Sequence, residues 1–125
     1  MNKECPFFES INESLLAETE YAYAFRDKFP VSRLHTLIVP KRSVEDYFGL
    51  SDQERNDIHD LIVSQSNLIK EEDPEVEGFN IGWNCGEVAG QTVSHAHVHL
   101  IPRRKGDVEN PRGGVRYVFP EKANY

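Results

Sequence analysis

The stretch SHAHVHLIPRR, residues 94–104, decides the fold of this chain because histidine and apolar residues alternate within it. The three histidines are His95, His97 and His99, with an alanine and a valine between them and a leucine after them. A period of two is typical of a β-strand, whose successive side chains point to opposite faces of the sheet. The pattern predicts a strand over 94–103, with three imidazoles on one face and the apolar side chains in the core beneath a helix.

Outward from that strand, the chain contains four more strand patterns and two helical ones. Aromatic residues alternate with smaller ones over 15–27, which predicts two short strands around a turn near residues 19–20. Further strands are expected over 34–41 and 78–85. Ser51 and Glu54 form a capping-box pattern that begins an amphipathic helix over 52–72, and a shorter helix is expected over 44–49. Strands in hairpin-like pairs favour an α+β fold with an antiparallel sheet over a doubly wound parallel one.

Length and charge limit the classes of function. The 125 residues suggest one domain, 1–125, with residues 110–125 as a C-terminal extension rich in turn formers. The net charge of −7 repels the phosphate backbone at long range, so we expect no nucleic-acid partner. No apolar run reaches the roughly 20 residues of a membrane helix, and the N-terminus has no signal-like core, so no membrane partner is expected. Two scattered cysteines, Cys5 and Cys85, fit the reducing cytoplasm.

Three histidines in strict alternation predict a reactive site, because histidine is neither a strong strand former nor a common core residue. One interpretation is a zinc site, since an HxH pair on a strand can supply two ligands. The other is metal-free chemistry, in which a neutral imidazole attacks as a nucleophile and its neighbours hydrogen-bond an anion or pass a proton. The preceding loop, GEVAGQT (86–92), offers glycine amides, Gln91 and Thr92, which suit phosphate oxygens.

A fourth histidine lies on another predicted strand. His35 and Leu37 share a face of the strand over 34–41, and Phe25 and Asp27 share a face of the strand before it. If both strands neighbour the histidine strand, Phe25 and Leu37 form an apolar wall for a nucleobase, and Asp27 can accept hydrogen bonds from ribose hydroxyls. The residues alone favour plain core for Phe25 and Leu37, and they fit Asp27 equally well as the cap of a turn.

The segment HAHVHLI (95–101) resembles the signature of the histidine triad (HIT) nucleotide hydrolases and transferases. Three further segments are similar to the same family: RDKFPVSRLHTLIVPKR (26–42), GFNIGWNCGEVAGQ (78–91) and IPRRKGD (101–107). The closing NPRGGVRYVFPEKANY (110–125) resembles the tail of bacterial members described as diadenosine-polyphosphate hydrolase-like. The resemblance implies a HIT-like α+β fold, with a five-stranded antiparallel sheet, one long and one short helix, and a homodimer.

The resemblance also implies a reaction. The middle histidine, His97, attacks the α-phosphorus of a nucleoside 5′-phosphate derivative, such as a dinucleoside polyphosphate or a nucleoside phosphoramidate. Water then hydrolyses the nucleotidyl-histidine intermediate. By position, the implied catalytic residues are His97, His99, His95 and His35. The residues implied to bind substrate are Phe25, Asp27, Leu37, Asn84, Gln91, Thr92 and His99. No cofactor and no metal ligand are expected.

The chain departs from the family in places. Many bacterial members begin with a CPxC zinc motif, but here CPFF keeps Cys5 and has Phe8, so we expect no structural zinc. Arg33 and Leu34 stand where many relatives have Pro-Gly, and Arg33 either adds a cation to the site or points to solvent. The third triad histidine is intact, which favours a hydrolase over a uridylyl transferase. Two alternatives remain: a nucleotide-binding regulatory module with incidental hydrolysis, and a zinc-dependent hydrolase.

Overall fold

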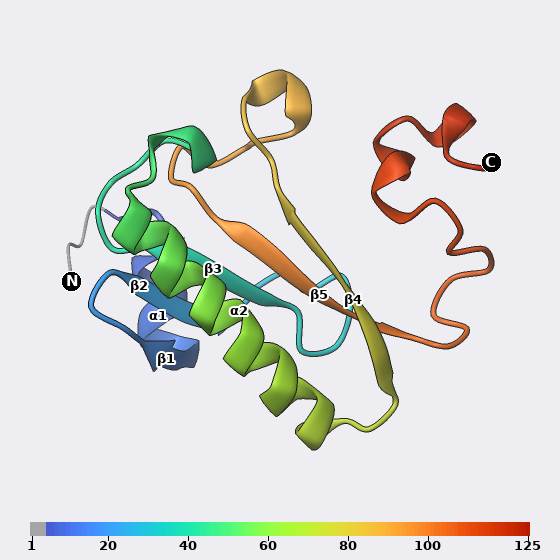
Figure 1. Cartoon of the computed structure of the whole chain (residues 1–125), viewed down its shortest axis with the longest axis horizontal. Helices are drawn as coiled ribbons and strands as arrows, with labels where there is room; N and C mark the ends of the chain where they lie inside the picture. Colours follow the sequence, from blue (N-terminus) through green and yellow to red (C-terminus); the bar gives the residue numbers. More distant parts are fainter. Residues whose placement is uncertain (1–4) are drawn as a thin grey trace.

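The structure is a computed structural model of the chain and describes residues 5–125. Five strands form one sheet in the order β1-β2-β3-β5-β4, and every neighbouring pair is antiparallel. The strands are β1 (Leu15–Glu18), β2 (Ala22–Arg26), β3 (Thr36–Pro40), β4 (Val76–Trp83) and β5 (Val98–Arg104). Two α-helices, α1 (Phe8–Ser14) and α2 (Asp52–Glu72), pack on opposite faces of this sheet (Figure 1). The predicted α+β fold is confirmed.

The short helix lies elsewhere than predicted. It is α1, whose one buried side chain, Ile11, packs against β2 and β3. The predicted segment 44–49 holds only a single 3₁₀ turn, η1 (Tyr47–Gly49), which the side chain of Asp46 caps by accepting the Phe48 N–H at 2.9 Å. The sequence signal for α1 is weak because no side chain caps its start.

Helix α2 begins where the capping box predicts. The Glu54 N–H donates to Ser51 Oγ at 3.1 Å, and the Ser51 N–H donates to Glu54 Oε1 at 2.8 Å. These two bonds satisfy donors that a helix start leaves without intrahelical partners. The predicted apolar stripe of α2 faces the sheet, with the exception of Leu68, which is 53% exposed.

The sheet has a core on each face. Toward α2, a cluster of small and branched side chains packs against the helix: Ala22, Ala24, Ile38, Ile58, Leu61, Ala96 and Val98. Toward α1, a second cluster contains Ile11, Phe25, Leu37 and Val39. The apolar residues between the histidines, together with Leu100, are therefore buried beneath α2, as their alternation predicts.

Residues beyond β5 form a separate tail with two 3₁₀ turns, η3 (Gly114–Val118) and η4 (Pro120–Lys122). Figure 1 shows this tail, in red, apart from the helices and beside β4. Gly113 adopts φ 98°, and a Cβ there would clash with the carbonyl of Ala123, so the tail needs glycine at this turn. Over residues 5–125, no helix combines the length and the apolar character that crossing a bilayer requires.

Candidate active site

Only the last histidine of the triad lies on a strand. Strand β5 begins at Val98, whereas the predicted strand begins at residue 94. Ahead of β5, the Ala96 N–H donates to the carbonyl of Val44 at 2.7 Å instead of pairing with β3. The prediction is therefore wrong over 94–97, because the loop that precedes η1 competes for the backbone of this segment.

His95 is the buried member of the triad. Its side chain is buried, and Nε2–H donates to the carbonyl of Pro40 at 2.9 Å. The ring thus satisfies a carbonyl at the end of β3 that a neighbouring strand would otherwise bond. The ring packs against the same Phe7 as His97 does, with centroids 6.0 Å apart, but it is covered and lines neither described cavity, so His95 anchors the segment beside the site.

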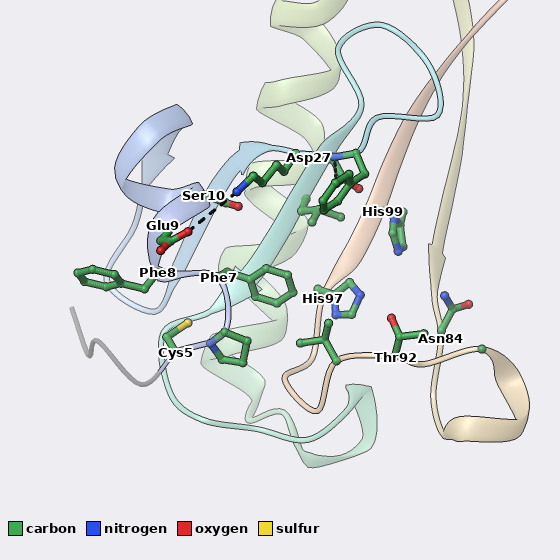
Figure 2. Close-up of a pocket in the computed structure, with 16 residues that line it drawn as sticks. Cys5, Phe7, Phe8, Glu9, Ser10, Asp27, Asn84, Thr92, His97 and His99 are labelled. Atoms are coloured by element: carbon green, nitrogen blue, oxygen red, sulfur yellow. Dashed lines mark hydrogen bonds and ion pairs between the residues drawn. The ribbon is translucent and has the colours of Figure 1, made fainter.

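His97 and His99 open into a cavity of about 630 Å³ on the α1 side of the sheet. Two hydrogen-bonding side chains, Thr92 and Asn84, line the same cavity. Figure 2 shows these four side chains together at one end, with the segment 5–10 at the other. The structure therefore brings two triad histidines together with polar groups that come from the preceding loop and from the end of β4.

The hydrogen bonds of His97 fix which ring nitrogen is free. Its Nδ1 lies 2.8 Å from the carbonyl oxygen of His95. A carbonyl can only accept, so Nδ1 carries the proton and the neutral ring keeps a lone pair on Nε2. Within residues 5–125, no hydrogen-bond partner occupies that Nε2. The ring also packs edge-on against Phe7, with centroids 5.1 Å apart, which holds its orientation.

A second chain of hydrogen bonds fixes His99. The Val31 N–H donates to His35 Nδ1 at 3.1 Å, so the proton of neutral His35 lies on Nε2. That Nε2–H donates to His99 Nδ1 at 2.9 Å. His99 must then carry its own proton on Nε2. The site therefore contains one imidazole with a free lone pair, His97, and one with a free N–H donor, His99.

Burial keeps both His35 and His99 neutral. Burial, with smaller effects of the nearby His97 and His35, lowers the pKa of His99 to about 4, against the opposing effect of Asp27. Burial also lowers the pKa of His35, again against Asp27. At pH 7 both rings are therefore uncharged, as the assignment of protons requires.

Asp27 borders the cavity and also caps a turn. Its Oδ1 accepts the Phe29 N–H at 2.9 Å, and its Oδ2 lies 3.4 Å from His35 Nε2. In the described part of the chain, Asp27, His35 and His99 bring ligand atoms within 4.8 Å of one another. They fit a metal poorly, because the backbone N–H on His35 Nδ1 leaves a proton, and no lone pair, on the Nε2 that faces the group.

The two predicted base-wall residues differ in position. Leu37 lines the cavity, although it is almost fully buried. Phe25 is completely buried behind it and does not line the cavity. Its ring packs against Phe7, with centroids 5.6 Å apart. Phe25 therefore supports the wall from the core, and Phe7 presents the aromatic surface.

Gln91 holds the loop instead of facing the cavity. Its Oε1 accepts the Gly86 N–H at 2.8 Å, and its Nε2 donates to the carbonyls of Glu45 at 2.7 Å and Val93 at 3.0 Å. Both N–H donors of the amide are therefore engaged, and none is left for a phosphate oxygen. The Gly90 N–H also bonds within the loop, to the carbonyl of Glu87 at 3.0 Å. The glycine amides expected to approach an anion are thus both used to shape the loop.

Arg33 lies outside the site. It forms ion pairs with Asp73 at 3.1 Å and Glu72 at 3.8 Å, and its side chain is largely exposed. Arg33 lines neither described cavity. Of the two alternatives for this residue, the structure therefore supports a side chain directed to solvent and not a cation added to the site. Leu34 adopts φ 72°, the left-handed region in which glycine is favoured.

Sequence reasoning missed the N-terminal wall of the cavity. Six side chains there have no assigned role in the sequence patterns: Pro6, Phe7, Phe8, Glu9, Ser10 and Lys28. Cys5 lines this end too. The aromatic pair after a proline is the only sequence signal, and it does not say which sheet face the segment covers. Tertiary packing alone brings it to the histidines.

Comparison with known proteins finds enzymes that act on adenosine compounds among the relatives of this chain. An adenosine 5′-monophosphoramidase of Candida albicans is 35% identical over 92 residues, which cover 71% of this chain and 60% of that protein. A bis(5′-adenosyl)-triphosphatase of Dictyostelium discoideum is 37% identical over 92 residues, 74% of this chain and 61% of that protein. The chain thus spans about three fifths of these two relatives.

Comparison with solved structures and with family models identifies the family of this chain. The crystal structure of a HIT family protein from Bacillus anthracis matches with a TM-score of 0.73 and 39% identity, covering 83% of this chain and 76% of that one. The family model described as the HIT domain matches residues 9–106, which contain the whole triad and every strand. This chain belongs to the HIT family.

Proposed function

We propose that this protein hydrolyses nucleoside 5′-phosphate derivatives at the α-phosphate, through a nucleotidyl intermediate on His97. The observation that carries the proposal is the hydrogen bond from His97 Nδ1–H to the carbonyl of His95, which leaves the Nε2 lone pair at a cavity with polar walls. The names of the two enzymes among the relatives, a phosphoramidase and a triphosphatase of adenosine compounds, support the same substrate class.

The first step forms a phosphorus–nitrogen bond. His97 Nε2 attacks the α-phosphorus, and the bond from phosphorus to the leaving atom breaks, so that an oxygen departs as its anion and a nitrogen departs as an amine after taking one proton from solvent. The ring becomes positively charged as the bond forms, and the carbonyl of His95 stabilises that charge by accepting Nδ1–H. Thr92 and Asn84 are positioned to donate to the phosphate oxygens. A preorganised donor of this kind is typically worth about 3 kcal/mol in the transition state.

His99 completes the first step from the other side. Its Nε2–H is the free donor of the pair, and we assign it to the phosphate and leaving-group oxygens. The low pKa of His99 matters here, because its ring centroid is 5.2 Å from that of His97. A second cation at that distance would oppose the positive charge that His97 develops, whereas a neutral donor does not.

The second step returns the enzyme to its starting state. Water attacks the phosphorus, the bond to Nε2 breaks, and one proton of the water is released as the nucleoside monophosphate leaves. His97 regains its lone pair on Nε2. Asp27 is suited to the ribose hydroxyls and Leu37 to one face of the base, because both border the cavity. His35 and His95 act by orienting the two reacting rings.

We also infer that the protein forms a homodimer, that it needs no metal, and that it is located in the cytoplasm. Strand β4 is at an edge of the sheet, and Ile81 on it is 47% exposed, which suits pairing with a second copy. The two cysteines are free thiols, which suits a reducing compartment. Light scattering at micromolar concentration checks the assembly, and a monomeric mass contradicts it.

Turnover of adenosine 5′-phosphoramidate tests the proposed function. We expect His97→Ala to lose at least about 1,000-fold in kcat while still binding AMP, because the nucleophile is gone and the cavity remains. His59→Ala is the matched control, since His59 is exposed on α2, and it should retain full activity. Residual activity above a tenth in His97→Ala contradicts the assignment.

Two further results would favour the alternatives. A wild-type rate far below about one per minute on every nucleotide derivative would favour a binding module whose hydrolysis is incidental. Loss of activity after chelation, with recovery on adding zinc, would favour a zinc hydrolase. We expect activity to survive chelation, because no step above requires a metal.

A further inference from the structure

The end of the cavity farthest from the triad is polar, and the mechanism above does not use it. Glu9, in the first turn of α1, and Lys28, just after β2, both line this end. Glu9 Oε2 and Lys28 Nζ lie 4.0 Å apart, with side chains 77% and 53% exposed. In Figure 2, Phe7 lies between Glu9 and His97, so the charged pair and the nucleophile are at opposite ends of one cavity.

A nucleotide bound with its α-phosphate at His97 could reach the pair with its base. A nucleotide whose α-phosphate lies at His97 extends its ribose and base away from the phosphate. Phe7 and Leu37 supply apolar surface along the way, and Asp27 borders the same path. The hydrogen-bonding edge of the base then meets Glu9 and Lys28, since these are the charged groups at the end of the path.

We propose that Glu9 and Lys28 recognise the base and make the site prefer guanine to adenine. The proposal rests on the proposed function for the position of the phosphate. A lysine ammonium only donates hydrogen bonds, and a carboxylate only accepts them. Guanine presents an O6 acceptor next to two neighbouring donors, N1–H and the N2 amino group. Adenine presents one amino donor and one ring-nitrogen acceptor.

Counting bonds gives the direction of the preference. The two parallel donors of guanine match the two oxygens of the Glu9 carboxylate, while Lys28 meets O6. Adenine can make one bond to each side chain. Guanine therefore gains one charge-assisted hydrogen bond. Because both side chains are largely exposed, we expect a preference of about fivefold, less than the same bond would give in a buried site.

The pair is also loose enough to open for a base. A separation of 4.0 Å between exposed groups is a weak ion pair, and inserting a base edge costs little. The pair of Arg103 and Asp107 offers a contrast. It makes two hydrogen bonds, of 2.8 and 3.0 Å, that a ligand would have to break. Glu9 and Lys28 can therefore give up their ion pair and bind a ligand more easily than Arg103 and Asp107 can.

Hydrolysis of matched substrates tests the proposal. The kcat/KM of the wild type should be about fivefold higher for guanosine 5′-phosphoramidate than for the adenosine compound. The inosine compound, which lacks the N2 amino group and so makes only two bonds, should fall to about the value of the adenosine compound. Glu9→Ala should bring the guanosine-to-adenosine ratio close to one. Glu13→Ala, on the same helix but exposed and outside the cavity, should leave the ratio unchanged.

Binding separates this proposal from the proposed function. Calorimetry of GMP and AMP with the whole chain needs no turnover, and GMP should bind about fivefold more tightly in the wild type and equally in Glu9→Ala. If this difference is found while no phosphoramidate is hydrolysed, base recognition stands and the hydrolase proposal fails. Equal binding of both nucleotides, tighter binding of AMP, or a guanine preference that survives Glu9→Ala overturns the base recognition.

Discussion

Lowering the pH from 7 to 5 should destabilise the fold through His99. Burial and the neighbouring imidazoles lower its pKa to about 4, against 6.5 for an unperturbed histidine. As the pH falls below 6.5, the unfolded chain binds a proton at this position and the folded chain does not. The free energy of unfolding therefore falls with pH between 6.5 and about 4, and levels off below that.

The size of the effect follows from the two pKa values. Their difference corresponds to about 3.4 kcal/mol in full, of which about 1.8 kcal/mol is lost between pH 7 and pH 5. His99 is partly exposed to the cavity, so screening by solvent reduces this loss to about 1 kcal/mol. His35 adds to the loss, because burial lowers its pKa as well.

Urea denaturation at pH 7, 6 and 5 measures this loss. The wild type should lose about 1 kcal/mol more between pH 7 and pH 5 than His99→Asn, which cannot take up that proton. His59→Asn, at an exposed position of α2, should lose as much as the wild type. If the wild type and His99→Asn lose stability equally, the burial of a neutral His99 is refuted.

Two further predictions concern stability and the tail. Glu54→Ala removes the carboxylate that caps α2 and pairs with Arg42, so urea denaturation should show a loss of about 2 kcal/mol; exposed Asp52→Ala should lose about 0.5 kcal/mol or less, and equal losses would contradict the capping role. Gly113→Ala places a Cβ against the Ala123 carbonyl, so amide exchange over 110–125 should rise while the sheet stays protected. Unchanged exchange in the tail would contradict that clash.

The sheet and the long helix could be predicted because their signals are local. The alternation around Val98 reports the two faces of β5 within a few residues, and the capping box of α2 spans only Ser51 to Glu54. The buried apolar residues of the triad segment follow from the same alternation. Each of these signals depends on neighbours in the chain, so one sequence is enough to find it.

The site could be predicted less well because it depends on distant contacts. His95 is engaged outside the cavity because it donates to the carbonyl of Pro40, far earlier in the chain. Gln91 leaves the cavity because the carbonyl of Glu45 accepts its amide. Phe7 reaches His97 only through the packing of α1 against the sheet. No periodicity encodes such contacts, so the sequence points to the histidines of the cavity and not to the walls around them.

The covalent bond on His97 is the most direct test of the account. Wild-type protein mixed with excess nucleoside phosphoramidate should be quenched with alkaline denaturant during the first turnover, because phosphorus–nitrogen bonds to histidine survive base. Intact-mass spectrometry should then show one added nucleotidyl group, and fragmentation should place it on His97. His97→Ala should show none. An adduct on any other residue, or turnover with no adduct at any quench time, would contradict the nucleophile assigned here.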